Sequence, residues 1–577
     1  MGEKSGVLRL VLIAGFALAI FFIGPKLGLW GSNDKPQLVP DEKYVNAPGF
    51  APDTVDSPGT PRPEEGELCK IDGKRFDATL STRGAAITHF HLEGGKYEGM
   101  DLSTTPDQER WRSLRTLFRG PEGGDQLAYD RFNWKLAGQD GKSCTFEFQD
   151  ENAKITKKVS ATDRPFELQV DTTITNLAST PKKHTFSIAT AAYRTNKEVK
   201  GGFGRQSPFL TELACAAGKD LVKKAKDDFK PGWFAVPGVD RYAAVNSHYF
   251  SQALVPMTEP ARCEILAEEW PAGLPHDHDD APTVYHAKLV YPAKELAPQQ
   301  SASYSEIGFF GPKERDVLDA AAGGHKLNDV LYLGYFTPVA KFLVSVLRFF
   351  YGLIGNWGIS IICMTLCLRL ALFPLSLKQI KTTIAMRKLK PEVDALNEKF
   401  KDDAQAKNLA MMELWKKHGV NPFGGCLPQL VQMPVWFAMY TTLQTAVEVY
   451  HVKFLWFADM SAPDKLFILP LVLGGLMIVQ QRIVPQQGMD PVQQKMMMWM
   501  LPVVFTVMML FLPAALGVYM LTNSLLGILQ QLVVEQVAPR TDKADKDTPG
   551  GPTKNKDGSK AKKEIVVKQI GKDKARV

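Results

Sequence analysis

One arginine interrupts an apolar stretch that is long enough to cross a membrane. Residues Trp357–Pro374 read WGISIICMTLCLRLALFP, and Arg369 is the only charged residue among them. Because arginine keeps its proton, its charge at a helix centre costs about 2.5–3.5 kcal/mol on insertion scales. Such a charge usually faces protein or a water-filled cavity, which predicts a functional site. The alternative is that the side chain extends to the membrane interface, since Lys378 follows nine residues later.

Further apolar stretches predict a multi-pass α-helical membrane protein with six spans. Residues 1–31 resemble a signal sequence without a convincing cleavage site, so we expect an uncleaved anchor. Residues 353–537 are expected to form a core of five transmembrane helices. Their expected positions are about Leu353–Pro374, Phe423–Val447, Leu466–Ile483, Met496–Leu512 and Ala514–Val534.

The hydrophobic period changes to two between the anchor and the core. Phe166, Leu168, Val170 and Ile174 alternate with polar neighbours, which is typical of strands with one buried face. Residues 67–325 are therefore expected to form a large antiparallel β-sandwich, with one helical insert at Leu213–Lys226. Residues 32–66 contain seven prolines and are expected to be an extended linker.

An amphipathic helix is expected within residues 326–352. Lys341, Ser345 and Arg348 fall on one helical face, and apolar residues cover the rest. This pattern favours a helix lying in the membrane surface. Packing against the β-sandwich is the alternative.

The distribution of basic residues predicts the orientation. The loop 376–421 carries ten Lys/Arg, whereas the loop Glu448–Lys465 carries two. Positive loops stay in the cytoplasm, so both termini are expected there and the β-sandwich domain in the periplasm. The loop 376–421 is expected to be a helical hairpin with a break at Asp402–Asp403 and a kink at Pro391. Residues 538–577 are expected to be a basic, disordered tail.

Four cysteines lie in the sandwich region. Cys69, Cys144, Cys215 and Cys263 could form two disulfides in any of three pairings if that region is exported. Free thiols are the alternative, because a domain of this size does not need cross-links.

No motif for catalysis is present. The sequence lacks a phosphate-binding loop, a paired-His zinc helix and a nucleophile elbow, so no enzyme, cofactor, catalytic residue or metal site is expected. His276–Asp280 (HDHDD) lies between prolines and reads as an exposed loop rather than a metal site.

Polar and aromatic side chains accompany Arg369 in the spans. Their helical spacing places several on one face, and no Asp or Glu occurs within the apolar span cores. This pattern favours a hydrated groove, since such groups are unfavourable facing lipid. Simple hydrogen bonding between helices is the alternative. The residues are Thr365, Gln429, Gln432, Trp436, Tyr440, Tyr519 and Asn523.

Long motifs in the core resemble the YidC membrane-protein insertases of the YidC/Oxa/Alb family. The runs are GNWGISIICMTLCLRLALFPLSLKQ, MRKLKPEVDALNEKFKDD, MMELWKKHGVNPFGGCLPQLVQMPVWFAMY and PVQQKMMMWMLPVVFTVMMLFLPAALGVYMLTNSLLGILQQ. FFGPKE and the large β-domain resemble the Gram-negative form, and the resemblance extends from Glu67 to Val537.

The resemblance implies an insertase core around a groove that is open to the cytoplasm and to lipid. The characteristic groove arginine of the family falls on Arg369. Position 508 is commonly Phe in relatives and is Met here, which puts a purely aromatic role at that site in doubt. Implied substrate contacts fall on Thr365, Gln432, Met433, Trp436, Pro502, Met508 and Tyr519.

The expected function is therefore insertion and folding of nascent proteins in the bacterial inner membrane. Implied partners are the Sec translocon with its SecDF accessory complex, and ribosomes contacting the cytoplasmic hairpin and basic tail. The lipid bilayer is also a partner, and DNA is not. A solute transporter or channel with a periplasmic receptor domain is the competing function, but the sequence shows no internal repeat. A membrane-anchored sugar-processing enzyme is a second competing function.

Overall fold

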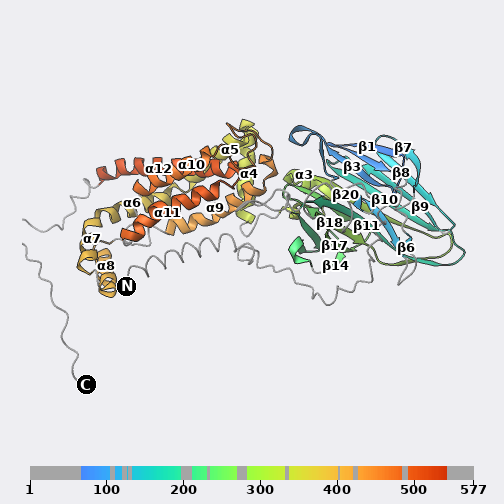
Figure 1. The fold of residues 1–577 in the computed structure, drawn as a ribbon, viewed down its shortest axis with the longest axis horizontal. Helices are drawn as coiled ribbons and strands as arrows, with labels where there is room; N and C mark the ends of the chain where they lie inside the picture. Colours follow the sequence, from blue (N-terminus) through green and yellow to red (C-terminus); the bar gives the residue numbers. More distant parts are fainter. Residues whose placement is uncertain are drawn as a thin grey trace, which may run out of the picture. The chain divides into compact units, whose positions relative to one another are not determined.

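The computed structural model describes residues 66–541 except 104, 106–110, 120–125, 128–132, 152, 196–210, 230–233, 270–281, 326, 332–336, 401–402, 420–426 and 484–490. The predicted anchor, the linker up to residue 65, the tail beyond residue 541 and the His276–Asp280 motif lie outside the described residues. Strands fill the first part of the described chain, and helices fill the second (Figure 1).

The largest sheet has nine antiparallel strands. Strand β10 shows why these residues form it: Leu168, Val170, Thr172 and Ile174 are buried, whereas the residues between them are partly exposed. The alternation expected from the sequence is thus confirmed. In sheet order the strands are β13 (Asp220–Ala225), β12 (Glu212–Ala217), β15 (Tyr242–Asn246), β16 (Phe250–Pro256), β20 (Ser301–Pro312), β10 (Glu167–Asn176), β9 (Ala153–Ala161), β8 (Ser143–Gln149) and β7 (Lys135–Gln139).

A seven-stranded sheet packs against it. Phe186 of the second sheet stacks on Tyr304 of the first with ring centroids 4.4 Å apart, inside one shared apolar core. This arrangement confirms the predicted antiparallel β-sandwich. The strands are β14 (Phe234–Val239), β17 (Ala261–Glu269), β18 (Thr283–Val290), β11 (Lys182–Arg194), β5 (Arg115–Arg119) and β6 (Gln126–Leu127), with β19 (Lys294–Leu296) paired to β11.

A smaller four-stranded sheet begins the domain. Its order follows the chain, and the buried residues of β2 and β3, such as Phe76 and Phe90, join the same core. The strands are β1 (Leu68–Gly73), β2 (Phe76–Ser81), β3 (Ala86–Leu92) and β4 (Met100–Asp101).

The predicted helical insert at Leu213–Lys226 is wrong. The segment forms the hairpin β12–β13, with Gly218 at a φ of 55° in the turn. Leu213 and Cys215 are fully buried, and β12 lies between two partner strands. Burial and strand pairing therefore override the helix preference of the Ala- and Lys-rich sequence.

Two disulfides tie the sheets of the β-domain together. Cys69 of β1 is bonded to Cys144 of β8, and Cys215 of β12 to Cys263 of β17. The second bond joins the nine-stranded sheet to the seven-stranded sheet. The four cysteines are therefore disulfide-bonded rather than free thiols. Of the three possible pairings, the structure contains Cys69–Cys144 with Cys215–Cys263.

The helical part contains a helix at each position where the sequence predicts a core span. Its core includes Leu343, Ile361, Met439 and Tyr519, which come from four different helices. The helices are α4 (Thr337–Ile354), α5 (Trp357–Ala371), α6 (Phe373–Lys388), α7 (Lys390–Lys399), α8 (Ala404–Lys417), α9 (Leu427–Thr445), α10 (Ile468–Ile483), α11 (Pro491–Met509) and α12 (Ala514–Thr541). The short helix α3 (Arg315–Ala320) follows β20.

Helix α4 has the amphipathic character that the sequence predicts. Ala340, Leu343 and Leu347 are buried against α5 and α9, whereas Lys341 and Ser345 of the predicted polar face are exposed. Its position in the membrane surface stays a prediction.

The first helix predicted in the loop 376–421 is divided into α6 and α7 next to the expected kink at Pro391, and the second is α8. Helices α7 and α8 form the hairpin. The two helices pack through Val393, Met411 and Leu414. Asp403 caps α8 by accepting hydrogen bonds from the backbone N–H groups of Gln405 and Ala406 at 3.0 Å.

The count of six spans is not confirmed. Among the described residues, only Ala514–Val537 forms one helix that is long and apolar enough to span a membrane. Helices α5 and α6 together could count as a second, bent by 66°. The bend follows from Pro374, which has no N–H to continue the hydrogen bonding of α5 and is suited to the first turn of α6. Helix α10 and residues Met498–Met509 are apolar but shorter.

Candidate functional site around Arg369

Arg369 lies in the last turn of α5. Asn356 starts the helix by accepting a hydrogen bond from the N–H of Ile359 at 3.1 Å, and the helix ends at Ala371. Backbone carbonyls at a helix C-terminus carry partial negative charge, which favours a cation there. The fold thus partly compensates for placing this arginine in an apolar helix.

Both hydrogen bonds that the described structure gives Arg369 are made to one residue of α12. Nε donates to Oδ1 of Asn523, and Nη2 donates to the backbone carbonyl oxygen of Asn523, each at 2.7 Å. No carboxylate of the described residues lies within ion-pair distance. Within the described part of the chain, the guanidinium is therefore positioned by neutral oxygens, and no carboxylate neutralises its charge.

Gly527 follows Asn523 by one helical turn and was not predicted as a site residue. A Cβ atom at this position would lie 3.0 Å from Nη2 and 3.5 Å from Cζ of Arg369. The glycine thus makes room for the guanidinium against α12. The i, i+4 spacing of Asn523 and Gly527 is the sequence signal that could have revealed it.

The aromatic residues predicted on α9 lie together. Trp436 and Tyr440 stack with ring centroids 5.9 Å apart and 19° between their planes. Met433, one turn earlier, is exposed. Gln429 and Gln432 belong to the same helix, but their side chains lie outside the described part of the structure.

The remaining predicted site residues are turned inward. Thr365 is buried and donates to the carbonyl of Ile361 at 2.7 Å, so its hydroxyl is occupied by its own helix. Met508 and Tyr519 are buried in the helical core, and Pro502 is buried within α11. Their substrate contacts stay predictions, because this arrangement of helices leaves little of these side chains exposed.

Most of the chain matches known protein families. Residues 349–542 match the family described as "60Kd inner membrane protein", and residues 68–346 match "YidC periplasmic domain". A membrane protein insertase YidC from Anaeromyxobacter sp. (strain K) is 35% identical, over 82% of this chain and 86% of its own. One from Geotalea daltonii is 31% identical, over 93% of this chain and 100% of its own. The chain belongs to the YidC family.

YidC relatives confirm the resemblance that the core motifs suggested. The matched families describe an inner membrane protein with a periplasmic domain, and the relatives are named insertases rather than enzymes. Among solved structures, a crystal structure of an active YidC insertase aligns with a TM-score of 0.35 and 16% identity, over 81% of this chain and 94% of that chain. A galactose mutarotase related enzyme from Lactobacillus acidophilus aligns with a TM-score of 0.31 and 10% identity, over 42% of this chain and 97% of its own.

Proposed function

We propose that this chain inserts nascent proteins into the bacterial inner membrane, and that Arg369 receives acidic segments of the substrate. The observation that carries this proposal is the bonding of the guanidinium to the neutral oxygens of Asn523. A cation without a carboxylate partner keeps its attraction for a visiting anion, and low-dielectric surroundings strengthen that attraction.

The driving force comes from the substrate. Each Leu or Ile that enters the bilayer contributes roughly 0.3–0.6 kcal/mol, so a span of about twenty such residues outweighs the transfer of one or two charges. An acidic segment moving outward gains about 2.3 kcal/mol per charge at 100 mV, positive outside. Burial of the apolar span and the membrane potential would together drive insertion without nucleotide hydrolysis. The sequence accordingly has no phosphate-binding loop.

The proposed path is a hydrated groove beside Arg369. Gln429 and Gln432 would keep the polar part of the substrate solvated, and Thr365 would join them when the helices that bury it separate. Its apolar span would pass the stacked rings of Trp436 and Tyr440 on its way to lipid. Further contacts are assigned to Met433, Pro502, Met508, Tyr519 and Asn523.

The wider setting is part of the same proposal. Six spans would place both termini in the cytoplasm and the β-domain in the periplasm. The domain boundaries are those predicted from the sequence. The Sec translocon with SecDF would deliver some substrates, and ribosomes would contact the hairpin 376–421 and the basic tail 538–577.

The test compares Arg369→Ala and Arg369→Lys in cells depleted of the endogenous insertase. The substrates are one membrane protein with an acidic outer tail and its copy with Asn and Gln in place of Asp and Glu. Arg369→Ala should impair insertion of the acidic version more, whereas Arg369→Lys should retain much of the activity. Arg482→Ala is the matched control, because Arg482 is also an arginine in the last turn of an apolar helix, α10, and is exposed. Equal loss in the Ala and Lys variants on both substrates would contradict a role for the charge.

A photo-crosslinker at position 436 tests the path separately. It should capture arrested nascent membrane proteins if the substrate passes Trp436. If the variant carrying the crosslinker inserts substrates but captures none, the substrate path does not pass the aromatic residues of α9.

A further inference from the structure

Three adjacent strands of the small sheet place a row of metal-binding residue types side by side. In the register of β2, β3 and β4, Asp77 pairs with His91 and His91 pairs with Asp101. His89 precedes His91 by two residues and so points to the same face of the sheet. The opposite face carries Phe90, which is buried in the core. The row is therefore fixed by strand pairing on a rigid sheet.

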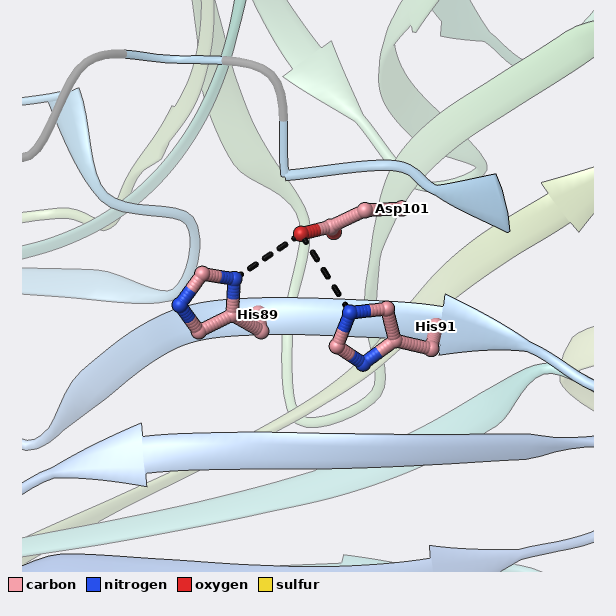
Figure 2. A group of neighbouring side chains, drawn as sticks. All are labelled: His89, His91 and Asp101. Atoms are coloured by element: carbon pink, nitrogen blue, oxygen red, sulfur yellow. Dashed lines mark hydrogen bonds and ion pairs between the residues drawn. The ribbon is translucent and has the colours of Figure 1, made fainter. Parts of the chain in front are cut away.

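The donor atoms of three of these residues converge (Figure 2). Oδ2 of Asp101 lies 2.9 Å from Nδ1 of His89 and 3.7 Å from Nε2 of His91. One ligand atom from each residue can be chosen so that all three lie within 4.8 Å of one another. Bonds of about 2.0–2.2 Å to a tetrahedral zinc ion separate its ligands by roughly 3.3–3.5 Å. The two spacings from Asp101 bracket that separation, so small rotations of these side chains would accommodate an ion.

A second set of contacts orients the ligands. Oδ2 of Asp77 lies 3.2 Å from Nδ1 of His91, which is the ring nitrogen that does not face Asp101. Oδ1 of Asp101 accepts backbone N–H groups from Phe90 at 3.0 Å and Ser103 at 2.8 Å, which leaves Oδ2 toward the imidazoles. Carboxylate–histidine pairs and anchored carboxylates of this kind commonly support metal ligands in proteins.

We propose that His89, His91 and Asp101 bind a divalent metal ion of the zinc class, with Asp77 positioning His91. Two imidazoles and one carboxylate suit Zn²⁺, Ni²⁺ or Cu²⁺ and do not suit Mg²⁺ or Ca²⁺, which prefer oxygen ligands. The side chain of His89 is 58% exposed and that of His91 39%. The site is therefore open to an ion from solution, and water would complete the coordination.

The test measures Zn²⁺ binding by calorimetry to the full chain in detergent, without a histidine tag. One equivalent should bind to the wild type. His89→Gln and His91→Gln should each weaken binding at least tenfold. Asp77→Asn should weaken it roughly 10–100-fold, as loss of an orienting partner does elsewhere. Thermal unfolding of each variant without metal should match that of the wild type, which shows that it is folded.

His418→Gln is the matched control. His418 also faces a carboxylate, with its Nε2 3.4 Å from Oε2 of Glu392, but it has a single imidazole. This variant should bind Zn²⁺ like the wild type. The proposal is overturned if the wild type binds no Zn²⁺, or if the double variant His89→Gln/His91→Gln retains wild-type affinity. In either case the residues form two ordinary His–Asp pairs.

Discussion

Gly527 of α12 lies directly against the guanidinium of Arg369 of α5, where a Cβ atom would approach Nη2 to 3.0 Å. Together with the two oxygens of Asn523, this glycine determines where the positive charge is held. The position of the arginine therefore depends on α12 as much as on its own helix.

Replacing Gly527 by Leu should displace the guanidinium from Asn523. We expect about a tenfold loss of insertion rate for acidic-tail substrates, equivalent to ~1.4 kcal/mol. Stability should not fall through the helix itself, because Leu is the better helix former by up to about 1 kcal/mol. Gly475→Leu is the control, since nothing lies within 4 Å of a Cβ at that position of α10. Equal insertion rates for the two variants would show that crowding the arginine does not matter.

Replacing Asn523 by Asp should neutralise Arg369 while nearly keeping the shape of the side chain. The bond from Nε would become an ion pair, so we expect the acidic-tail substrate to lose about as much insertion as in Arg369→Ala. The amount of folded protein should stay the same or rise. Protease protection of the substrate tail measures the first quantity, and detergent-resistant folded protein the second.

Asn356→Asp is the control at the other end of α5. Asn356 caps the helix through its side-chain oxygen, and Asp caps helices equally well. Full activity of Asn523→Asp would mean that the free charge of Arg369 is not required.

Removing the Cys215–Cys263 disulfide should lower the stability of the β-domain. The bond closes a loop with a sequence separation of 48 residues. Loss of such a cross-link typically costs about 2–4 kcal/mol, so Cys215→Ala/Cys263→Ala should unfold at lower denaturant concentration. Cys363→Ala/Cys367→Ala should not change the β-domain transition, because these cysteines are free and belong to α5. An unchanged transition in the first double variant would contradict this role.

His184 should make the β-domain less stable in acid. Burial, with a smaller contribution from Lys294, lowers the pKa of His184 to about 4, and its Nε2 lies 2.9 Å from the Tyr304 hydroxyl. The unfolded chain protonates this histidine near its ordinary pKa of about 6.5. Below that pH the unfolded state binds more protons, so the free energy of unfolding falls between about pH 6.5 and 4.

His184→Gln should flatten that pH dependence by roughly 2–3 kcal/mol over the window. The β-sheet circular dichroism signal followed during denaturation at several pH values measures the change. Part of the slope should remain, because burial also lowers the pKa of His248 to about 4. An unchanged slope in His184→Gln, in a variant that is folded at neutral pH, would refute the assignment.

The sequence predicted most of the architecture because hydrophobic periodicity is a local property. The alternation from Phe166 to Ile174 identified β10 and its buried face. The prediction from local sequence failed at Leu213–Lys226, because the contacts that decide its structure come from β15 and from Cys263. Those partners are distant in sequence, so the local preference for helix was misleading.

The candidate site was predicted only as a set of residues. Arg369 and Asn523 were both recognised as polar residues in apolar spans, but their hydrogen bonding depends on how α5 and α12 pack. His89, His91 and Asp101 were missed for a related reason. Their proximity requires the strand register that the turn containing Gly94 and Gly99, both at positive φ, allows.

The bond between Cys215 and Cys263 also limits how the β-domain can take part in insertion. The disulfide links the two sheets of the sandwich covalently, so they cannot separate at this position to admit an apolar segment of a substrate. A substrate that contacts this domain while the bond is intact would therefore meet its outer surface at this position.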